Sequence, residues 1–161
     1  MGAVDVRAVS DYFLSEMAQS GESLSNLKLQ KMLYYAQGWF LAINGRPLFD
    51  NEIQAWVHGP VVVDEYHRFK EAGYAPIIWD GREVDLPEDV AQFLDRVIYT
   101  YGSESAYGLE VRTHREAPWV LARGDIHEGE PSNAVITVES MAEYFGGKLS
   151  AQTERQSREI N

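Results

Sequence analysis

The sequence predicts a mainly α-helical protein, a single compact domain of about six helices with a small β strand or hairpin at one edge. Most apolar residues recur at intervals of three and four, the spacing that places side chains on one face of a helix. Only a short segment near residues 52–58 alternates apolar and polar residues as a half-buried strand does. Gly, Pro and Asn separate these segments, and no internal repeat stands out.

The segment 26–43 is the element around which we expect the rest of the chain to pack. Tyr35 and Trp39 widen its apolar stripe, so this helix should be covered over much of its circumference. The stripe itself consists of Leu29, Met32, Leu33, Ala36, Phe40 and Ile43. Residues typical of helix ends flank the segment, namely Ser23 or Ser25 before it and Asn44, Gly45 and Pro47 after it.

The same spacing predicts the other helices. They cover residues 4–17, about 60–72, 87–101, 106–115, a short turn or helix at 119–123, and a closing helix that starts near Thr137. Gly146-Gly147 is expected to stop the closing helix. Residues 150–161 are polar and should form a frayed helix or a mobile tail, so we divide the chain into a domain at 1–149 and a tail at 150–161.

Two local signals predict the β structure. Residues 52–58 form the strand, and Pro60 is expected to open the helix that follows, because its missing N–H is not needed at the first helical position. Asp80-Gly81 favours a tight turn, so residues 76–84 should form a small hairpin that could join the strand.

Composition limits the classes of function. The 161 residues are 45% hydrophobic and 24% charged, the balance of a soluble globular protein, and neither a long apolar run nor a leader segment is present, so we expect a cytoplasmic protein without membrane contact. No Cys is present, which excludes disulfides and thiol nucleophiles. The net charge of −11 disfavours nucleic acid; it either serves solubility or favours a basic partner.

Metal and cofactor sites are not indicated. His58 and His67 lie near Asp64 and Glu65, but their spacing does not match a zinc motif. No glycine-rich segment joins a strand to a helix, so no phosphate-binding cofactor is expected. Lys28 and Lys31 are expected on a solvated helix face. Gly38, inside the central helix, suggests close approach of a bulky aromatic residue such as Trp56.

One pair of residues is a candidate for catalysis. His114 with Glu116, or with Asp64, could serve a hydrolase or transferase, but a nucleophile within reach is not evident. The alternative, which we favour, is that His114 and Glu116 are polar tie-points that order a helix end. We therefore expect no catalytic residues and no enzyme.

Four segments, Leu29–Trp39, Pro47–Asp50, Glu52–Val62 and Thr113–Trp119, occur in an order and combination that is specific. Together they resemble the Panacea domain, a family of phage-associated proteins that includes Soc-type antitoxins. The resemblance extends from about residue 6 to residue 145. Two features depart from the family pattern: His58 precedes Gly-Pro where an aromatic residue is common, and the tail has no counterpart.

The resemblance implies the antitoxin of a toxin–antitoxin pair, which neutralises a cognate protein toxin, encoded by the adjacent gene, through direct binding. In the Soc pair the family member also delivers its toxin to the Clp protease, so a protease adaptor is the alternative. A regulatory protein that binds DNA is disfavoured by the net charge. A homo-oligomer is compatible with the sequence.

Two groups of residues are candidates for binding the partner or for fixing the shape of the domain. The first is Trp39, Trp56, His58, Gly59 and Pro60, and the second is His114, Glu116, Pro118 and Trp119. Either group could instead only mark helix starts. A partner-specific antitoxin should vary its contact residues, so the tail and the loop Glu128-Gly129-Glu130 are rival contact surfaces.

Overall fold

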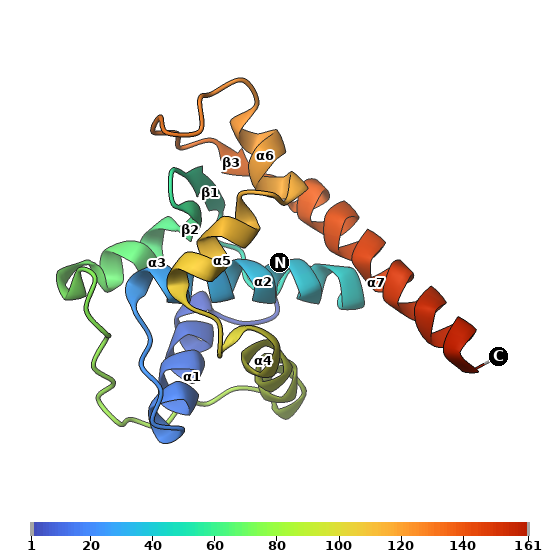
Figure 1. Ribbon diagram of the computed structural model, residues 1–161. Coiled ribbons are helices and arrows are strands. Elements are labelled where there is room, and N and C mark those ends of the chain that lie inside the picture. Colours follow the sequence, from blue (N-terminus) through green and yellow to red (C-terminus); the bar gives the residue numbers. More distant parts are fainter. Residues whose placement is uncertain (1, 161) are drawn as a thin grey trace.

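The computed structural model describes residues 2–160 and confirms the mainly α fold class, with 59% of the chain helical (Figure 1). The helices are α1 (Val6–Gln19), α2 (Asn26–Asn44), α3 (Val63–Arg68), α4 (Glu88–Tyr101), α5 (Ala106–Thr113), α6 (Ala117–Arg123) and α7 (Val138–Ile160), with a 3-10 turn η1 at Lys70–Ala72. Strands β1 (Ile53–Trp56), β2 (Gly59–Val62) and β3 (Val135–Ile136) form one antiparallel sheet in the order β2-β1-β3.

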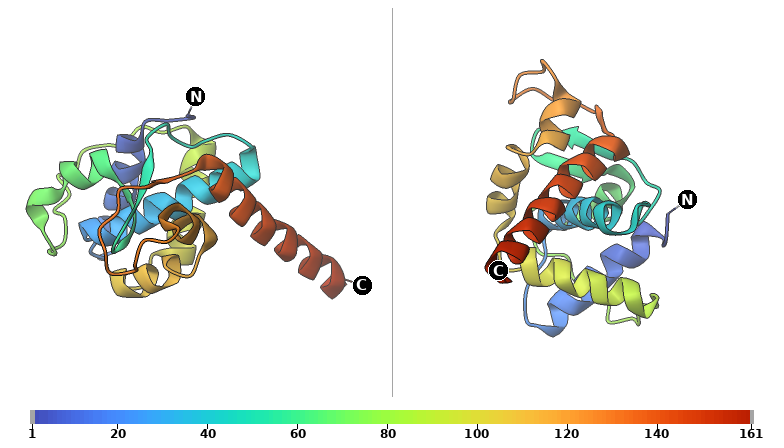
Figure 2. Two further views of the ribbon diagram at one scale, coloured as in Figure 1. Left: turned by 90° about the horizontal axis from the view of Figure 1, so that it is seen from above. Right: turned by 90° about the vertical axis from the view of Figure 1, so that its right-hand side faces the viewer.

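Helix α2 lies at the centre of the fold, as its apolar pattern predicts. It contacts α1, α3, α4, α5, α7 and β2, and in the two views of Figure 2 other elements surround it. Ser25 caps its start by accepting a hydrogen bond from the Lys28 amide (3.2 Å), and Gly45 ends it with a left-handed φ of 70°. The prediction placed Ile43 on the buried stripe, but Ile43 is half exposed in the last turn.

Helix α7 packs closely on α2 through Phe145. A Cβ atom on Gly38 would lie 2.1 Å from the Phe145 ring, so only glycine allows this contact. Tyr34, Tyr35 and Trp39 also meet this ring, edge-on. The predicted approach of an aromatic residue at Gly38 is therefore confirmed, but the residue is Phe145 and not Trp56.

The predicted helix at 60–72 is wrong in its first part. Residues 59–62 form β2, which pairs with β1 so that Pro60 lies opposite Ala55. Pro60 is compatible with this position because β2 is an edge strand, where a missing N–H leaves no ladder bond unmade. The helix begins only at Val63 and breaks at Phe69 into the 3-10 turn.

The hairpin predicted at Asp80-Gly81 is also wrong. Residues 77–87 are irregular, and the nearest strand-like contact is a single bridge between Ser25 and Pro76. Ile77 and Trp79 pack against the core and Ile78 between them is almost fully exposed, while the Ile77 amide donates to the Leu24 carbonyl (2.9 Å) instead of to a partner strand. The Asp80 carboxylate accepts the Arg82 amide (3.1 Å), a local turn that forms without strand pairing.

The predicted stop of the last helix at Gly146-Gly147 is wrong as well. Helix α7 continues through both glycines to Ile160, and residues 150–159 are exposed on a segment that projects from the body of the protein (Figures 1 and 2). Glycine lowers helix propensity but does not forbid a helix. The division of the chain at residue 149 stays a prediction. In the described part of the chain, no helix combines the length and hydropathy that a bilayer span requires.

The contact between Gly38 and Phe145 makes a testable prediction. Gly38→Ala should lower the free energy of unfolding by about 1–3 kcal/mol, because the new methyl group overpacks the interface. Gly147→Ala is the matched control, since its Cβ would meet no atom within 4 Å and the gain in helix propensity of about 1 kcal/mol should stabilise the protein. Urea unfolding measures both, and equal stabilisation by the two substitutions would contradict the packing of α7 on α2.

Candidate functional site

Two buried polar side chains of α2 hold the outer edge of β2. The Gln30 Oε1 atom accepts a hydrogen bond from the Val62 amide (2.9 Å), and the Lys31 Nζ atom donates one to the Pro60 carbonyl (3.1 Å). Both side chains are fully buried. The solvated face predicted for the lysines is therefore wrong, because Lys31 and also Lys28, which donates to the Gly102 carbonyl, find backbone partners inside the protein.

Strands β1 and β2 form a hairpin, and Gly59 is required where this hairpin meets α2. Its φ of 107° lies in the region that residues with side chains rarely adopt. A Cβ atom there would lie 2.6 Å from the Lys31 Cε atom and 2.8 Å from the Thr113 Oγ1 atom. Gly59 and Pro60 thus fix the hairpin against α2 and α5, and both are buried.

Glu116 forms a second buried polar centre. Its carboxylate accepts hydrogen bonds from the hydroxyls of Tyr34 (3.0 Å) and Tyr35 (3.1 Å), which come from α2. Burial raises the pKa of Glu116, while the tyrosine hydrogen bonds and the nearby charges of Lys148 and Arg112 act in the opposite direction. This arrangement ties the start of α6 to α2.

Trp119 links α6 to the hairpin. Its indole N–H donates to the Trp56 carbonyl (2.9 Å), and its ring stacks on His114 at 4.2 Å. The His114 Nδ1 atom lies 3.4 Å from a carboxylate oxygen of Glu128, which belongs to the predicted rival loop. Pro118 stands in the first turn of α6, where its missing N–H costs nothing.

The structure does not pair the two candidate catalytic residues. Glu116 uses both carboxylate oxygens on Tyr34 and Tyr35, and within the described residues no hydrogen bond joins it to His114. Asp64 accepts a hydrogen bond from Asn51 (2.8 Å). This geometry offers no acid–base pair beside a nucleophile.

Trp39 lies apart from the hairpin residues with which the sequence grouped it. Its indole N–H donates to the Tyr101 hydroxyl (2.7 Å), and its ring meets Phe145 on the α7 side of α2. The α2 residues that bond to the β1–β2 hairpin are Gln30 and Lys31, which lie earlier on the helix than Trp39.

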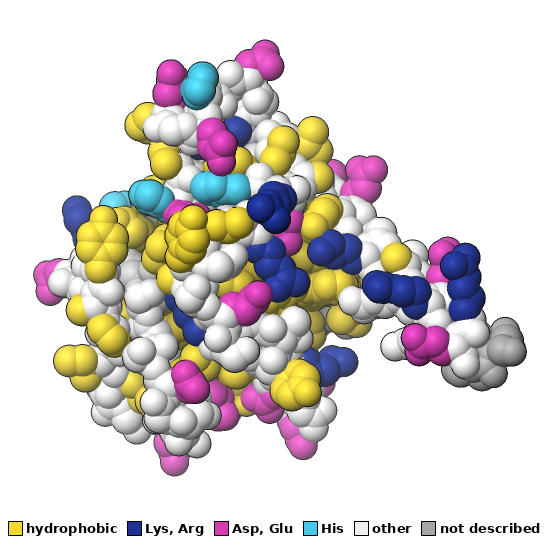
Figure 3. Space-filling model, viewed as in Figure 1, with side chains coloured by type: hydrophobic (Ala, Val, Ile, Leu, Met, Phe, Trp, Pro, Cys, Tyr) yellow, Lys and Arg dark blue, Asp and Glu magenta, His cyan; other side chains and the backbone are white. Residues whose placement is uncertain are grey.

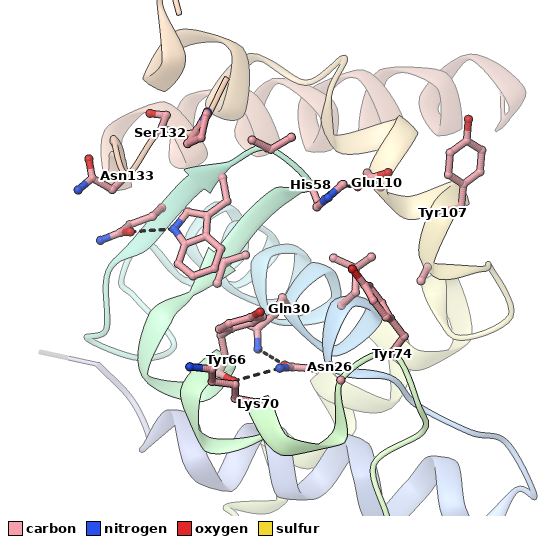
Figure 4. Close-up of a pocket in the computed structure, with 18 residues that line it drawn as sticks. Asn26, Gln30, His58, Tyr66, Lys70, Tyr74, Tyr107, Glu110, Ser132 and Asn133 are labelled. Carbon is pink, nitrogen blue, oxygen red and sulfur yellow. Dashed lines mark hydrogen bonds and ion pairs between the residues drawn. The ribbon is translucent and has the colours of Figure 1, made fainter. Parts of the chain in front are cut away.

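An open groove of about 1040 Å³ runs beside the hairpin (Figure 4). Its walls come from β1 and the β1–β2 turn, from α2, α3 and the chain after η1, from the start of α5, and from residues 131–133. Four aromatic residues line it, namely Trp56, Tyr66, Tyr74 and Tyr107. The Trp56 and Tyr66 rings meet edge to face at 4.9 Å, and Asn26 supports Tyr66 by donating to its carbonyl (3.0 Å).

His58 stands at the rim of the groove and is the most exposed residue of the first predicted group. Its Nδ1 atom lies 2.5 Å from a carboxylate oxygen of Glu110 on α5, and 69% of the His58 side chain is exposed. Sequence reasoning missed Glu110, Tyr66, Tyr74 and Tyr107. A signal for Tyr107 and Glu110 was available, because the spacing of Leu109 and Thr113 marks the buried face of α5 and leaves these two residues outside it.

Buried Arg123 was also missed. Its guanidinium donates to the Ala55 carbonyl (3.0 Å) on β1 and to the carbonyls of His127, Glu128 and Glu130. These bonds hold the acidic loop after α6 in place beside the sheet. A buried arginine whose hydrogen bonds go to backbone carbonyls leaves no periodic trace in the sequence.

Three of the four residues considered for a metal have separate partners. His58 lies against Glu110, Glu65 accepts from Arg68 (3.0 Å) and Asp64 accepts from Asn51. Among residues 2–160, no group of three or more His, Asp and Glu side chains is placed to hold a metal ion.

Comparison with known proteins identifies the relatives of this chain. Residues 29–120 match the family model described as Antitoxin SocA-like, Panacea domain. The curated protein Antitoxin SocA of Caulobacter vibrioides (strain NA1000 / CB15N) is 35% identical over 136 residues, which cover 76% of this chain and 72% of that protein. No solved structure gives a significant match. The matched range includes all four segments that carry the resemblance.

Buried Lys31 makes stability depend on pH. Burial lowers the pKa of Lys31 from 10.5 to about 7, so between these values the unfolded chain binds a proton that the folded chain lacks. Stability should therefore rise with pH across this window, by up to about 1.4 kcal/mol per pH unit from this residue. Lys31→Met removes the titrating group, so urea unfolding of the variant should show a smaller rise. Parallel pH profiles of the two proteins would show that Lys31 is not buried.

Proposed function

Because the chain belongs to the SocA-like antitoxin family with a Panacea domain, we propose that it is an antitoxin that neutralises a protein toxin by binding it directly. Family membership supports the antitoxin role. The resemblance seen in the four sequence segments is confirmed, since the family match covers every one of them. We further propose that the toxin is encoded beside this chain, and that both proteins act in the cytoplasm.

The aromatic groove is the surface that best supports such binding. Tyr74 and Tyr107 are 95% and 72% exposed, although large aromatic side chains usually avoid water. Tyr and Trp dominate the binding energy of many protein interfaces because they offer a large apolar body with a polar tip. The groove also presents Trp56 and the His58–Glu110 pair at its rim, which would give a partner a fixed polar contact.

The buried residues of the four family segments would hold the groove in position without contacting the partner. Gly59, Pro60, Glu116, Pro118 and Trp119 are buried and bonded within the protein, so they position the groove rather than touch a partner. We propose that His58 and Trp56 are the contact residues of the first predicted group. The proposed role is binding without catalysis, which agrees with the separate environments of His114 and Glu116.

Direct neutralisation differs from delivery to a protease in a measurable way. A mixture of the two purified proteins contains no protease, so only direct binding can restore the activity that the toxin inhibits. The adjacent-gene product should copurify with the full chain and lose its toxic activity in this mixture. Copurification without loss of toxic activity would instead favour an adaptor for a Clp-type protease, and absence of a complex would contradict both roles.

The groove can be tested by one substitution. Tyr107→Ala should weaken toxin binding by about 2 kcal/mol or more, as expected for an interfacial tyrosine near the centre of a contact. Tyr99→Ala is the matched control, because Tyr99 is 90% exposed on α4 and does not line the groove. Titration calorimetry measures both variants. Equal affinity of the two would place the toxin on another surface.

A further inference from the structure

Basic residues gather on one face of this acidic protein. Five of the 14 Lys and Arg residues lie on α5, just after it, or on α7, and we call them the basic strip: Arg112, Arg115, Lys148, Arg155 and Arg158. Figure 3 shows dark blue side chains gathering where α5 approaches α7 and continuing along the projecting helix. The overall charge of −11 gives no hint of this local excess.

The strip is continuous from α5 to α7. Arg112 and Lys148 both lie close enough to Glu116 to act on its charge, so the two helices bring their cations together. Lys148, Arg155 and Arg158 then follow at intervals of seven and three, which place them on one face of α7. Glu154 and Glu159 lie at the edges of that face.

Most of these cations form no direct ion pair among the described residues. Arg112 pairs with Glu104 at 2.8 Å, but in the described part of the chain Arg115, Lys148, Arg155 and Arg158 make no ion pair within 4 Å. The protein has 25 acidic residues, so enough carboxylates are present to pair with every cation. Aromatic rings hold two of the cations in place, since Lys148 lies over the Tyr144 ring (5.1 Å) and Arg112 over the Tyr101 ring (5.2 Å).

The distal half of α7 does not pack against the body of the protein. Residues 150–159 are exposed, and Figure 2 shows the helix projecting from the body of the protein. The space-filling view of Figure 3 shows a notch between this helix and the body. A helical segment of this length is marginal without packing. Arg155 and Arg158 are exposed on this projecting segment, so they are accessible to a partner.

We propose that the basic strip is a docking surface for an acidic segment of the toxin. This inference rests on the proposed antitoxin function and adds a second contact, on the other side of α5 from the aromatic groove. Charge complementarity selects the occupant, because unpaired cations attract carboxylates and set the orientation of the partner. A nucleic acid is disfavoured, since the rest of the surface would repel its many phosphates.

Charge reversal on α7 tests the strip. The double variant Arg155→Glu and Arg158→Glu should weaken binding of the adjacent-gene toxin about tenfold at low salt, and the difference should shrink at high salt. The control reverses Arg7 and Arg46, two exposed cations outside the strip, and changes the net charge equally. The control should bind like the parent. Circular dichroism of both variants checks that the helices remain.

The outcomes separate the two proposals. Absence of a complex with the parent protein would contradict the antitoxin function itself. A parent complex whose affinity and salt dependence are unchanged by the α7 reversal would overturn the strip alone. Retention of duplex DNA or single-stranded RNA by the parent, with loss in the α7 variant and not in the control, would also overturn it by identifying a nucleic acid as the occupant.

Discussion

The hydrogen bonds from Gln30 and Lys31 to β2 are the constraint on which the hairpin depends. An edge strand exposes unpaired backbone groups, and here α2 satisfies the Val62 amide and the Pro60 carbonyl with side chains. Burying a lysine carries a large desolvation cost, which the hydrogen bond from the Lys31 Nζ atom to the Pro60 carbonyl partly offsets. Gly59 leaves room for the Lys31 methylenes.

The same principle extends along α2 and explains why distant sequence segments belong together. Gln37 accepts the Leu48 amide (2.8 Å) and donates to the Phe49 carbonyl (2.8 Å), while Tyr34 and Tyr35 hold Glu116. Each of the other three family segments is therefore bonded to the buried polar side of one helix. The exposed residues of the groove and of the basic strip take no part in these bonds.

Local patterns predicted the central helix and the need for a glycine at residue 38, because helix periodicity and glycine cost are properties of neighbouring residues. They failed where long-range hydrogen bonds decide the outcome. Lys31 looks like a surface lysine until the Pro60 carbonyl is brought to it by the fold. Asp80-Gly81 can form a turn, but the segment before it packs on the core and bonds to the Leu24 carbonyl instead of pairing with a second strand.

The candidate site was predictable in part for the same reason. Trp56 and His58 were found because a strand and a Gly-Pro signal mark them. Tyr66, Tyr74 and Tyr107 come from three separate segments that only the fold places around one groove. Trp39 was grouped with Trp56 and His58 because it lies on α2. Its position around the helix instead directs its side chain toward Tyr101.

Native-state hydrogen exchange at the Val62 amide tests whether α2 fixes the β1–β2 hairpin through buried polar contacts. This amide faces the outer edge of the sheet and bonds to the Gln30 side chain. We expect the Val62 amide to exchange only through a large opening of the protein. Its free energy of opening should be close to that of global unfolding and similar to that of the amides in the middle of α2. Fast exchange of Val62 beside slowly exchanging α2 amides would show that the hairpin moves independently and would contradict the account.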